Sequence, residues 1–544
     1  MKKIFLTFTP FFFMCHILMA QYSGGNGKGD VTANLVGKHL TNWFYIDGAM
    51  GNPGNWLDGN VPALPEEANI NATAMLDGSY IYQVVSISAT ASVIIPSGTD
   101  LSVTNSLINA NGINGIIIQD GGSLIQSTPD VNATVERQLS NADWTNGMDG
   151  WHLLSSPVEN QLVANGDFTT EPYDFYAWSE TANDWLNQKD GANNIISFIP
   201  GSAYLVSYDD GGTKSFTGEL NVNGITFTDL SLSGSSYYVG YHLLGNPFSS
   251  ALKWNDGNWA LSNVGGVASV WNEVAQNYIS LANPNDIIPA NQGFFVQVSD
   301  ASNSITIPAM AKTHSTQSFY KETPSNFLKL RISNSINETY DETIVRMKDD
   351  ATSAYDLAYD SHKITGSDIA PQLYTLIQEG ENVAVNTMAS TNFPVVVEMG
   401  FRPGVDAKYK LTAETFAFNR QVILEDKATR ITKVMAAGEF YTFHGAIGDA
   451  ENRFVLHFSP LVSPGPGNND LVEAYFSNGQ LYINSASSEM GSFSIFDLTG
   501  KPLAAGEISA HSLKSVSTQG FAPGIYLVNI VAGNTVTNHK VFIP

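Results

Sequence analysis

Two histidines occupy corresponding places in a repeated stretch of the sequence. His152 lies in WHLLSSPVENQLV and His242 in YHLLGNPFSSALK, each after an aromatic residue and before Leu-Leu. A histidine near a serine can act as general base for a nucleophilic attack. However, no glycine-framed elbow surrounds Ser155 and Ser156, and the second copy has Gly-Asn at these places. We therefore expect both histidines to be hydrogen-bonded structural residues in short strands.

Several tryptophans have the chemistry to stack on sugar rings. Trp178 and Trp271 recur at matched positions of the repeat, which favours packing in a core. Trp254 and Trp259 lie in KWNDGNWA, which has the composition of a loop, and binding residues concentrate on loops. We predict that Trp254 and Trp259 are the ligand-binding pair.

Familiar catalytic motifs are missing from the sequence. It contains no GxSxG elbow, HExxH motif, Walker loop, EF-hand loop or Rossmann glycine pattern. A glycan-cleaving enzyme needs only two carboxylates, which can come from strands distant in sequence. The sequence therefore names no catalytic residue, no metal ligand and no cofactor.

The chain is strongly acidic. It has 51 Asp and Glu against 26 Lys and Arg, a formal net charge of −25. This charge argues against nucleic acid as a partner. Solubility outside the cell explains it most simply, and Ca²⁺ bound on acidic loops is the alternative.

The repeat that carries the histidines continues through two further blocks. DFYAWSETANDW is matched by ASVWNEVAQNY, and AYLVSY by GFFVQV, in the same order. This pattern predicts duplicated β modules over residues 150–312, one at about 150–235 and one at about 240–312. Short alternating strands bounded by Gly, Pro, Asn and Asp are typical of β structure.

Residues 21–140 have a loop-rich start followed by a β-helix pattern. LDGSYIYQV from Leu76, PSGTDLSV from Pro96 and QDGGSLIQ from Gln119 each place a turn glycine before a short apolar strand. Recurrence at about 20 residues, with one short strand run in each repeat, is typical of a parallel β-helix. The motifs NW, GNW and GNVP before these segments resemble the start of β-helical segments in bacterial surface proteins.

The remaining sequence predicts two further sandwiches. Alternating strands after a polar stretch predict one antiparallel β-sandwich over residues 326–459. Residues 460–470 contain SPGPG and form a Pro/Gly linker, and the short strands of 471–544 predict a small Ig-like sandwich. The expected fold class is all-β and multidomain: a short parallel β-helix-like segment, duplicated β modules, a β-sandwich and a C-terminal Ig-like β-sandwich.

The first 20 residues have the pattern of a secretory signal peptide. Two lysines precede an apolar run, and cleavage is expected after Ala20. Cys15, the only cysteine, would leave with this peptide, so no disulfide is expected. No later segment has the roughly 20 consecutive apolar residues of a membrane span, so no transmembrane segment is expected in the mature chain.

The last 74 or so residues carry four motifs in order: NGQLYINS, FSIFDLTGKPL, FAPGIYLVNIVAGN and the terminal HKVFIP. They resemble the C-terminal sorting domain, of the type A or Por type, of cargo proteins of the type IX secretion system. The positions expected to form the sorting signal are Asp497, Gly500, Lys501, Gly524, Tyr526 and Lys540.

The resemblance implies a route and a partner. The signal peptide would pass the chain through the inner membrane, and the type IX secretion machinery would export it to the outer-membrane surface or the medium. Removal of the sorting domain, anchoring and release are left open. Residues 150–459 also resemble uncharacterised surface cargo proteins of this system.

These observations favour an adhesin-like protein that presents loops to surface glycan or extracellular matrix, and a binding protein over an enzyme. Two alternatives stand: a secreted glycan-active hydrolase or lyase with unidentified carboxylates, and a structural component of a surface layer. The sequence does not name the ligand.

Overall fold

The computed structural model describes residues 41–63, 67–142, 144, 150–164, 166–233, 238–315, 326–377, 380–389, 395–418, 422–458, 472–477, 480–485, 487–510, 512–533 and 535–543. Their regular structure consists of β-strands and short 3-10 helices, which confirms the all-β prediction. Among these residues, no helix has the length and apolar character to cross a membrane. The predicted signal peptide, residues 1–20, and linker, residues 460–470, lie outside the described residues.

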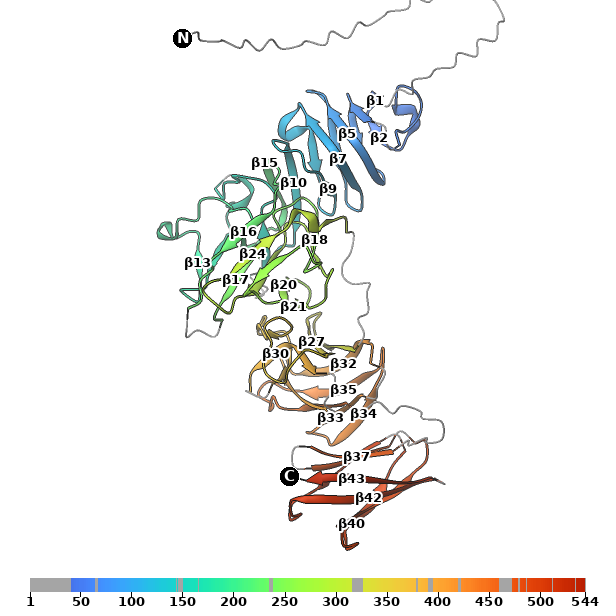
Figure 1. Ribbon diagram of the computed structural model, residues 1–544. Coiled ribbons are helices and arrows are strands. Elements are labelled where there is room, and N and C mark those ends of the chain that lie inside the picture. Colours follow the sequence, from blue (N-terminus) through green and yellow to red (C-terminus); the bar gives the residue numbers. More distant parts are fainter. Residues whose placement is uncertain are drawn as a thin grey trace, which may run out of the picture. The chain divides into compact units, whose positions relative to one another are not determined.

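Two parallel sheets enclose one core in the N-terminal part (Figure 1). Successive strands alternate between the sheet β1-β3-β5-β7-β9 and the sheet β2-β4-β6-β8-β10. The strands are β1 (Thr41–Phe44), β2 (Gly48–Ala49), β3 (Glu67–Ile70), β4 (Thr73–Met75), β5 (Ser79–Ile87), β6 (Ser92–Ile95), β7 (Asp100–Asn109), β8 (Ile116–Ile118), β9 (Ser123–Ile125) and β10 (Asn132–Leu139). Ser79 pairs with Asp100 and Asp100 with Ser123, so the three predicted rungs stack as in a parallel β-helix.

The β-helix continues without a break into the repeat region. Strand β15 (Gly212–Glu219) pairs antiparallel with the whole of β10, and thereby extends the second sheet. One apolar core includes Ile118 of the β-helix together with Phe175 and Phe216 of the first module. The first module therefore covers the end of the β-helix.

The repeat region contains two four-stranded antiparallel sheets with the same strand order. The first is β11 (His152–Ser155), β14 (Ala203–Tyr208), β12 (Tyr173–Ser179) and β13 (Asp184–Asn187). The second is β17 (Tyr241–Gly245), β23 (Gly293–Gln297), β20 (Ala268–Asn272) and β21 (Asn277–Leu281). Each strand of one sheet is matched by the strand that carries the corresponding block of the sequence repeat.

Shorter strands complete this region as two three-stranded sheets, β16-β24-β19 and β22-β18-β25. Their bounds are β16 (Ile225–Thr228), β18 (Ala251–Lys253), β19 (Ala260–Ser262), β22 (Ile287–Ile288), β24 (Ser304–Ile307) and β25 (Lys312–Thr313).

Residues 327–458 form one 11-stranded sheet, and most of its buried apolar side chains share one core. Its strands are β26 (Phe327–Asn334), β27 (Tyr340–Lys348), β28 (Ser361–His362), β29 (Gln372–Leu376), β30 (Asn382–Ala389), β31 (Val395–Arg402), β32 (Ala407–Phe416), β33 (Val422–Asp426), β34 (Ile431–Met435), β35 (Phe440–Gly445) and β36 (Phe454–Phe458). The sequence predicts an antiparallel arrangement, and the structure differs at one place, because β27 and β30 are parallel. The long connection between them supplies the crossover that a parallel pair requires.

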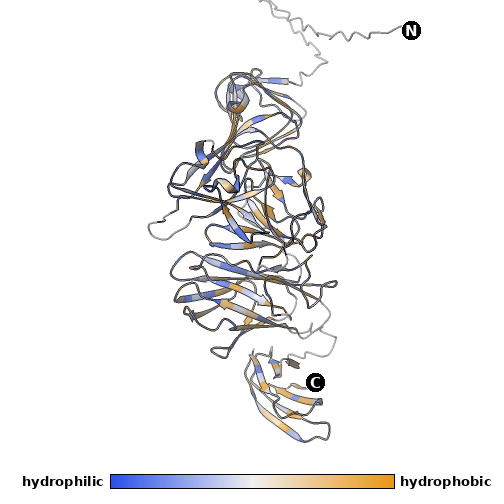
Figure 2. Cartoon of the chain, turned by 90° about the vertical axis from the view of Figure 1, so that its left-hand side faces the viewer, coloured by the Kyte–Doolittle hydropathy of each residue, from blue (hydrophilic) through white to orange (hydrophobic). Residues whose placement is uncertain are grey.

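The C-terminal part is a sandwich of the sheets β37-β38-β41 and β40-β39-β42-β43 over a core of its own. The strands are β37 (Val472–Ser477), β38 (Gln480–Ser485), β39 (Gly491–Phe496), β40 (Pro502–Ile508), β41 (Ser512–Ser517), β42 (Gly524–Ala532) and β43 (Thr535–Ile543). Along β42, alternate side chains are buried, as expected for a strand with one face on a core. Figure 2 shows the same mixture of hydrophobic and hydrophilic residues along the strands of the other parts.

Candidate functional site

The two modules bind each other through a reciprocal pair of tryptophans. The indole N–H of Trp178, in the first module, donates to the carbonyl of Tyr241 in the second, at 2.7 Å. The indole N–H of Trp271, in the second, donates to the carbonyl of Trp151 in the first, at 2.8 Å. Since these are corresponding positions of the repeat, each copy uses the same side chain to bind the first strand of the other. The prediction that Trp178 and Trp271 serve packing agrees with this geometry.

The backbones of the modules approach each other in the same reciprocal way. Ser155 N–H donates to the Asn291 carbonyl at 2.9 Å, and Gly245 N–H donates to the Gly201 carbonyl at 2.8 Å. Gly245 has no side chain at a point where a Cβ would lie 2.3 Å from the Cβ of Ser155. The modules are thus in backbone contact, and this contact requires glycine at position 245.

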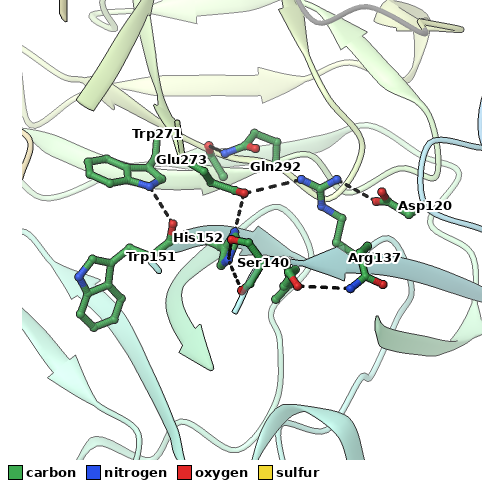
Figure 3. A network of polar contacts seen from close by, with 11 residues as sticks. Asp120, Arg137, Ser140, Trp151, His152, Trp271, Glu273 and Gln292 are labelled. Carbon is green, nitrogen blue, oxygen red and sulfur yellow. Dashed lines mark hydrogen bonds and ion pairs between the residues drawn. The ribbon is translucent and has the colours of Figure 1, made fainter. Parts of the chain in front are cut away.

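A polar network lies beside this contact and connects it to the β-helix (Figure 3). His152 is almost fully buried, and its Nδ1 contacts Oε1 of Glu273. Arg137 on β10 binds Asp120 at 2.8 Å through Nη1, and its Nη2 lies 3.9 Å from Oε1 of Glu273. The network therefore joins the β-helix, the first module and the second module.

Ser140, His152 and Glu273 have the order of a Ser-His-carboxylate triad. The Nε2 atom of His152 lies 3.3 Å from Oγ of Ser140, and its Nδ1 contacts the carboxylate. The same Nε2 atom also lies 3.3 Å from the backbone carbonyl of Ser140. A carboxylate only accepts, so Nδ1 donates to Glu273, and in a neutral ring Nε2 is then the acceptor that faces the Ser140 hydroxyl.

The second copy of the repeat shows which of these contacts the two modules share. His242 corresponds to His152, and its Nε2 lies 2.8 Å from the backbone carbonyl of Ser231. Both histidines therefore lie near the carbonyl of a preceding serine, and in the described part of the chain only His152 also has a serine hydroxyl near Nε2. The burial of His152 and its contacts to both modules support the prediction that it is structural, because the ring holds separate segments together.

Glu180 of the first module corresponds to Glu273 and is held by a different set of donors. Its Oε1 accepts hydrogen bonds from N and Oγ of Ser233, both at 2.8 Å, and from N of Gly240 at 3.0 Å. Burial raises the pKa of Glu180, but these bonds and one from Ser231 outweigh burial and lower it to about 2. Glu180 also affects His242. Burial lowers the pKa of His242 below its ordinary value, and the bond to Ser231 and the charge of Glu180 offset part of that effect.

Replacement of Glu180 by Gln is expected to lower the free energy of unfolding at neutral pH by about 1–3 kcal/mol, because a buried charged acceptor of three bonds is lost. The difference should shrink as the pH falls from the usual value of 4.5 toward 2, since the folded-state pKa lies below the unfolded one. Urea unfolding of both proteins at neutral and acid pH measures it. A difference that does not change with pH would count against this role of the carboxylate.

A cavity of about 360 Å³ opens beside the Arg137 end of the network. Its walls are the rung segments 97–98 and 118–123, the segment 135–137 of β10, residues 249, 251, 287 and 289–291 of the second module, and residue 315. Asp120 and Arg137 belong to both the network and the cavity wall. The structure thus brings charged and polar groups to a hollow of the size that small ligands occupy.

The structure places Trp254 and Trp259 in the core of the second module, not on a surface. The rings are 0% and 7% exposed, contact each other edge to face, and donate from Nε1 to the carbonyls of Gly266 and Lys253. Neither ring offers a face to a sugar. The prediction of an exposed pair is corrected for this reason: the Asn-Asp-Gly turn between them folds both indoles inward.

Three of the predicted sorting residues form a turn between β39 and β40. Oδ1 of Asp497 accepts bonds from Oγ1 and N of Thr499, at 2.6 and 2.8 Å, and from N of Lys501 at 3.0 Å. The Thr499 hydroxyl first, and then the Lys501 backbone, hold the pKa of Asp497 below its ordinary value. Gly500 has a φ of +84°, a left-handed conformation that glycine adopts without strain.

The other three lie on the last hairpin, formed by β42 and β43. Gly524 begins β42, and Tyr526 is buried, with its hydroxyl donating to the carbonyl of Ala522. Lys540 pairs with Leu527 and is exposed. The six positions therefore mark one turn and one hairpin of the same sheet.

No group of three or more His, Cys, Asp or Glu able to hold a metal ion occurs in the part of the chain that the structure describes. Ca²⁺ therefore stays a proposal without an assigned site.

Comparison with known families assigns most of the chain to one family. Residues 44–284 and 259–458 match a family described as a domain of unknown function, DUF8693. The chain belongs to the DUF8693 family. The matched region contains the β-helix, both modules and the 11-stranded sheet, so the network and the cavity are features of a DUF8693 region.

Residues 477–544 match a second family, described as a secretion system C-terminal sorting domain. This match confirms the resemblance on which the sorting residues were predicted. The chain is a cargo protein of the type IX secretion system, and it is secreted or located at the cell surface.

Other comparisons add little. No curated protein is significantly similar to the chain. Among solved structures, a chain described as "Biofilm associated protein - BSP domain" is aligned over 77% of this chain and 96% of its own, with 10% sequence identity and a TM-score of 0.14. A likeness at this TM-score supports no argument about fold or function.

Sequence reasoning missed the network of the DUF8693 region. Glu273 lies far from Asp120 and Arg137 in the chain, and no motif connects the three. One signal was present: Glu180 and Glu273 stand two residues after the matched tryptophans in AWSE and VWNE. A matched glutamate beside a matched histidine in each copy indicates a shared contact.

Proposed function

We propose that this protein is an adhesin-like binding protein, which the type IX secretion system delivers to the cell surface or the medium, where its DUF8693 region binds glycan or extracellular matrix. The match of the C-terminal residues to a sorting domain carries the proposal, because it places the DUF8693 region outside the cell. The acidic composition and the contacts that hold the β-helix and the two modules together suit a binding protein exposed to the medium.

The geometry of the network supports binding over nucleophilic catalysis. The ring of His152 is almost fully buried between the two modules, and its counterpart in the second copy contacts a backbone carbonyl. The glycan-active hydrolase or lyase and the surface-layer component remain the competing proposals, and attachment and product assays separate them from an adhesin.

Deletion of the gene is expected to reduce attachment of the producing cells to glycan-coated and matrix-coated surfaces, and the full chain should restore it. A chain that ends at residue 470 is the matched control, since it keeps the DUF8693 region and lacks the sorting domain. Unchanged attachment without the gene would contradict an adhesin role. Release of reducing sugar ends by the purified chain would favour the hydrolase instead.

A further inference from the structure

The cavity beside Arg137 is the strongest candidate for a ligand site in the described residues, and we propose that it binds a short neutral saccharide. The inference rests on the proposed function, because it names the ligand class and the place of binding in the DUF8693 region. The juxtaposition that carries it is a partly exposed guanidinium–carboxylate pair on the wall of a cavity of about 360 Å³.

The cavity is built by elements that are tied to one another. Leu124 N–H donates to the Ser249 carbonyl at 3.3 Å, and the Ser249 hydroxyl donates back to the Leu124 carbonyl at 3.1 Å. Nζ of Lys312 donates to the carbonyl of Gln126 at 2.6 Å. The second module is thereby fixed against the last rungs of the β-helix, so the cavity is formed before a ligand arrives.

The polar groups of the wall offer both donors and acceptors. Arg137 and Asp120 have side chains that are 27% and 38% exposed. Within the described residues the guanidinium of Arg137 hydrogen-bonds Asp120 through Nη1 and is ion-paired with Glu273 through Nη2, which leaves its other N–H groups as donors for a ligand. Vicinal sugar hydroxyls both donate and accept, and an Arg–Asp pair can serve both at once.

The charge of the wall selects against an acidic ligand. Asp120 and Glu136 line the cavity, and Glu273 lies 3.9 Å from the single guanidinium, so carboxylates outnumber the cation. The chain as a whole carries −25. A uronic acid, sulfated sugar or phosphate would meet a net negative wall, whereas a neutral saccharide would not.

The apolar part of the wall suits the C–H face of a sugar ring. Ile287 and Pro289 are the partly exposed apolar residues of the lining, whereas Ile118 and Val135 also border the cavity but are buried in the β-helix core. The volume lies near the lower end of the range for small-molecule sites, about 300–1,000 Å³, which is space for a short saccharide and too little for a folded partner.

A glycan array that contains neutral and acidic oligosaccharides, probed with the full chain recovered from producing cells, tests the proposal. The chain is expected to bind neutral glycans, and Ala290→Trp, which fills the cavity, should lower that binding at least about tenfold. Ala192→Trp on an exposed 3-10 helix is the matched control and should bind like the wild type. Asp120→Asn, which keeps size and removes the charged acceptor, should weaken binding by about tenfold.

The possible results distinguish a failure of the proposed binding site from a failure of the proposed adhesin function. Neutral-glycan binding that survives both Ala290→Trp and Asp120→Asn would overturn the site while the adhesin role stands. Preference for acidic glycans would overturn the ligand class. If the chain mediates cell attachment but binds no glycan, the saccharide proposal alone is overturned. If deletion of the gene does not change attachment, the proposed adhesin function is overturned as well.

Discussion

Gly245→Ala is expected to destabilise the pair of modules by about 3 kcal/mol, the upper part of the range for overpacking. The added Cβ would lie 2.3 Å from the Cβ of Ser155 and 2.7 Å from the carbonyl oxygen of Ser202. Neither neighbour can move freely, because Ser155 is in β11 and donates through its hydroxyl to the Asn246 carbonyl at 2.8 Å. The modules would have to separate locally, and the reciprocal tryptophan bonds would weaken with them.

Gly191→Ala is the matched control, since a Cβ at Gly191 meets no atom within 4 Å. Urea unfolding followed by tryptophan fluorescence measures both variants, because Trp178 and Trp271 lie at the contact. The double change Ser155→Gly with Gly245→Ala should recover part of the loss, since it removes the nearer clash. Equal stability of the Gly245 and Gly191 variants would show that the modules do not depend on this close approach.

The regular parts of the fold follow from local patterns. Turn glycines before short apolar strands predicted the rungs, and these stack because each strand buries its apolar side chains on the next. The sorting domain was recognised for a similar reason: its turn at Asp497 and its last hairpin depend on residues close together in sequence.

Contacts between distant segments could not be predicted in this way. Glu273 reaches His152 and approaches Arg137 because the two modules pack against each other, and the sequence does not contain their relative orientation. The error at Trp254 has a related cause. The composition of a turn predicts where the chain reverses but does not predict where its side chains point. The indole N–H of Trp254 donates to the backbone carbonyl of Gly266, and the ring is buried.

A chain that lacks residues 471–544 is expected to stay in the periplasm. The removed part contains both sheets of the C-terminal sandwich, which has a core of its own, and the whole match to the sorting domain. The DUF8693 region keeps its own cores and its network, so the truncated chain should fold and simply fail to leave. We expect nearly complete loss of export, since the secretion machinery would lack the surface that it recognises.

A single substitution in the sorting domain separates loss of the sorting signal from loss of the whole domain. Asp497→Ala removes the acceptor of three hydrogen bonds in the turn before β40 and leaves the apolar core in place. Export should fall but not vanish, while the amount of folded protein in the cell should be maintained.

Protease accessibility in intact cells is the measurement that tests the delivery of this protein most directly. Full-length chain should be degraded by added protease or recovered from the medium, and chain lacking residues 471–544 should be protected until the outer membrane is opened. Equal accessibility of the two chains would contradict the account, because the DUF8693 region would then reach the exterior without its sorting domain.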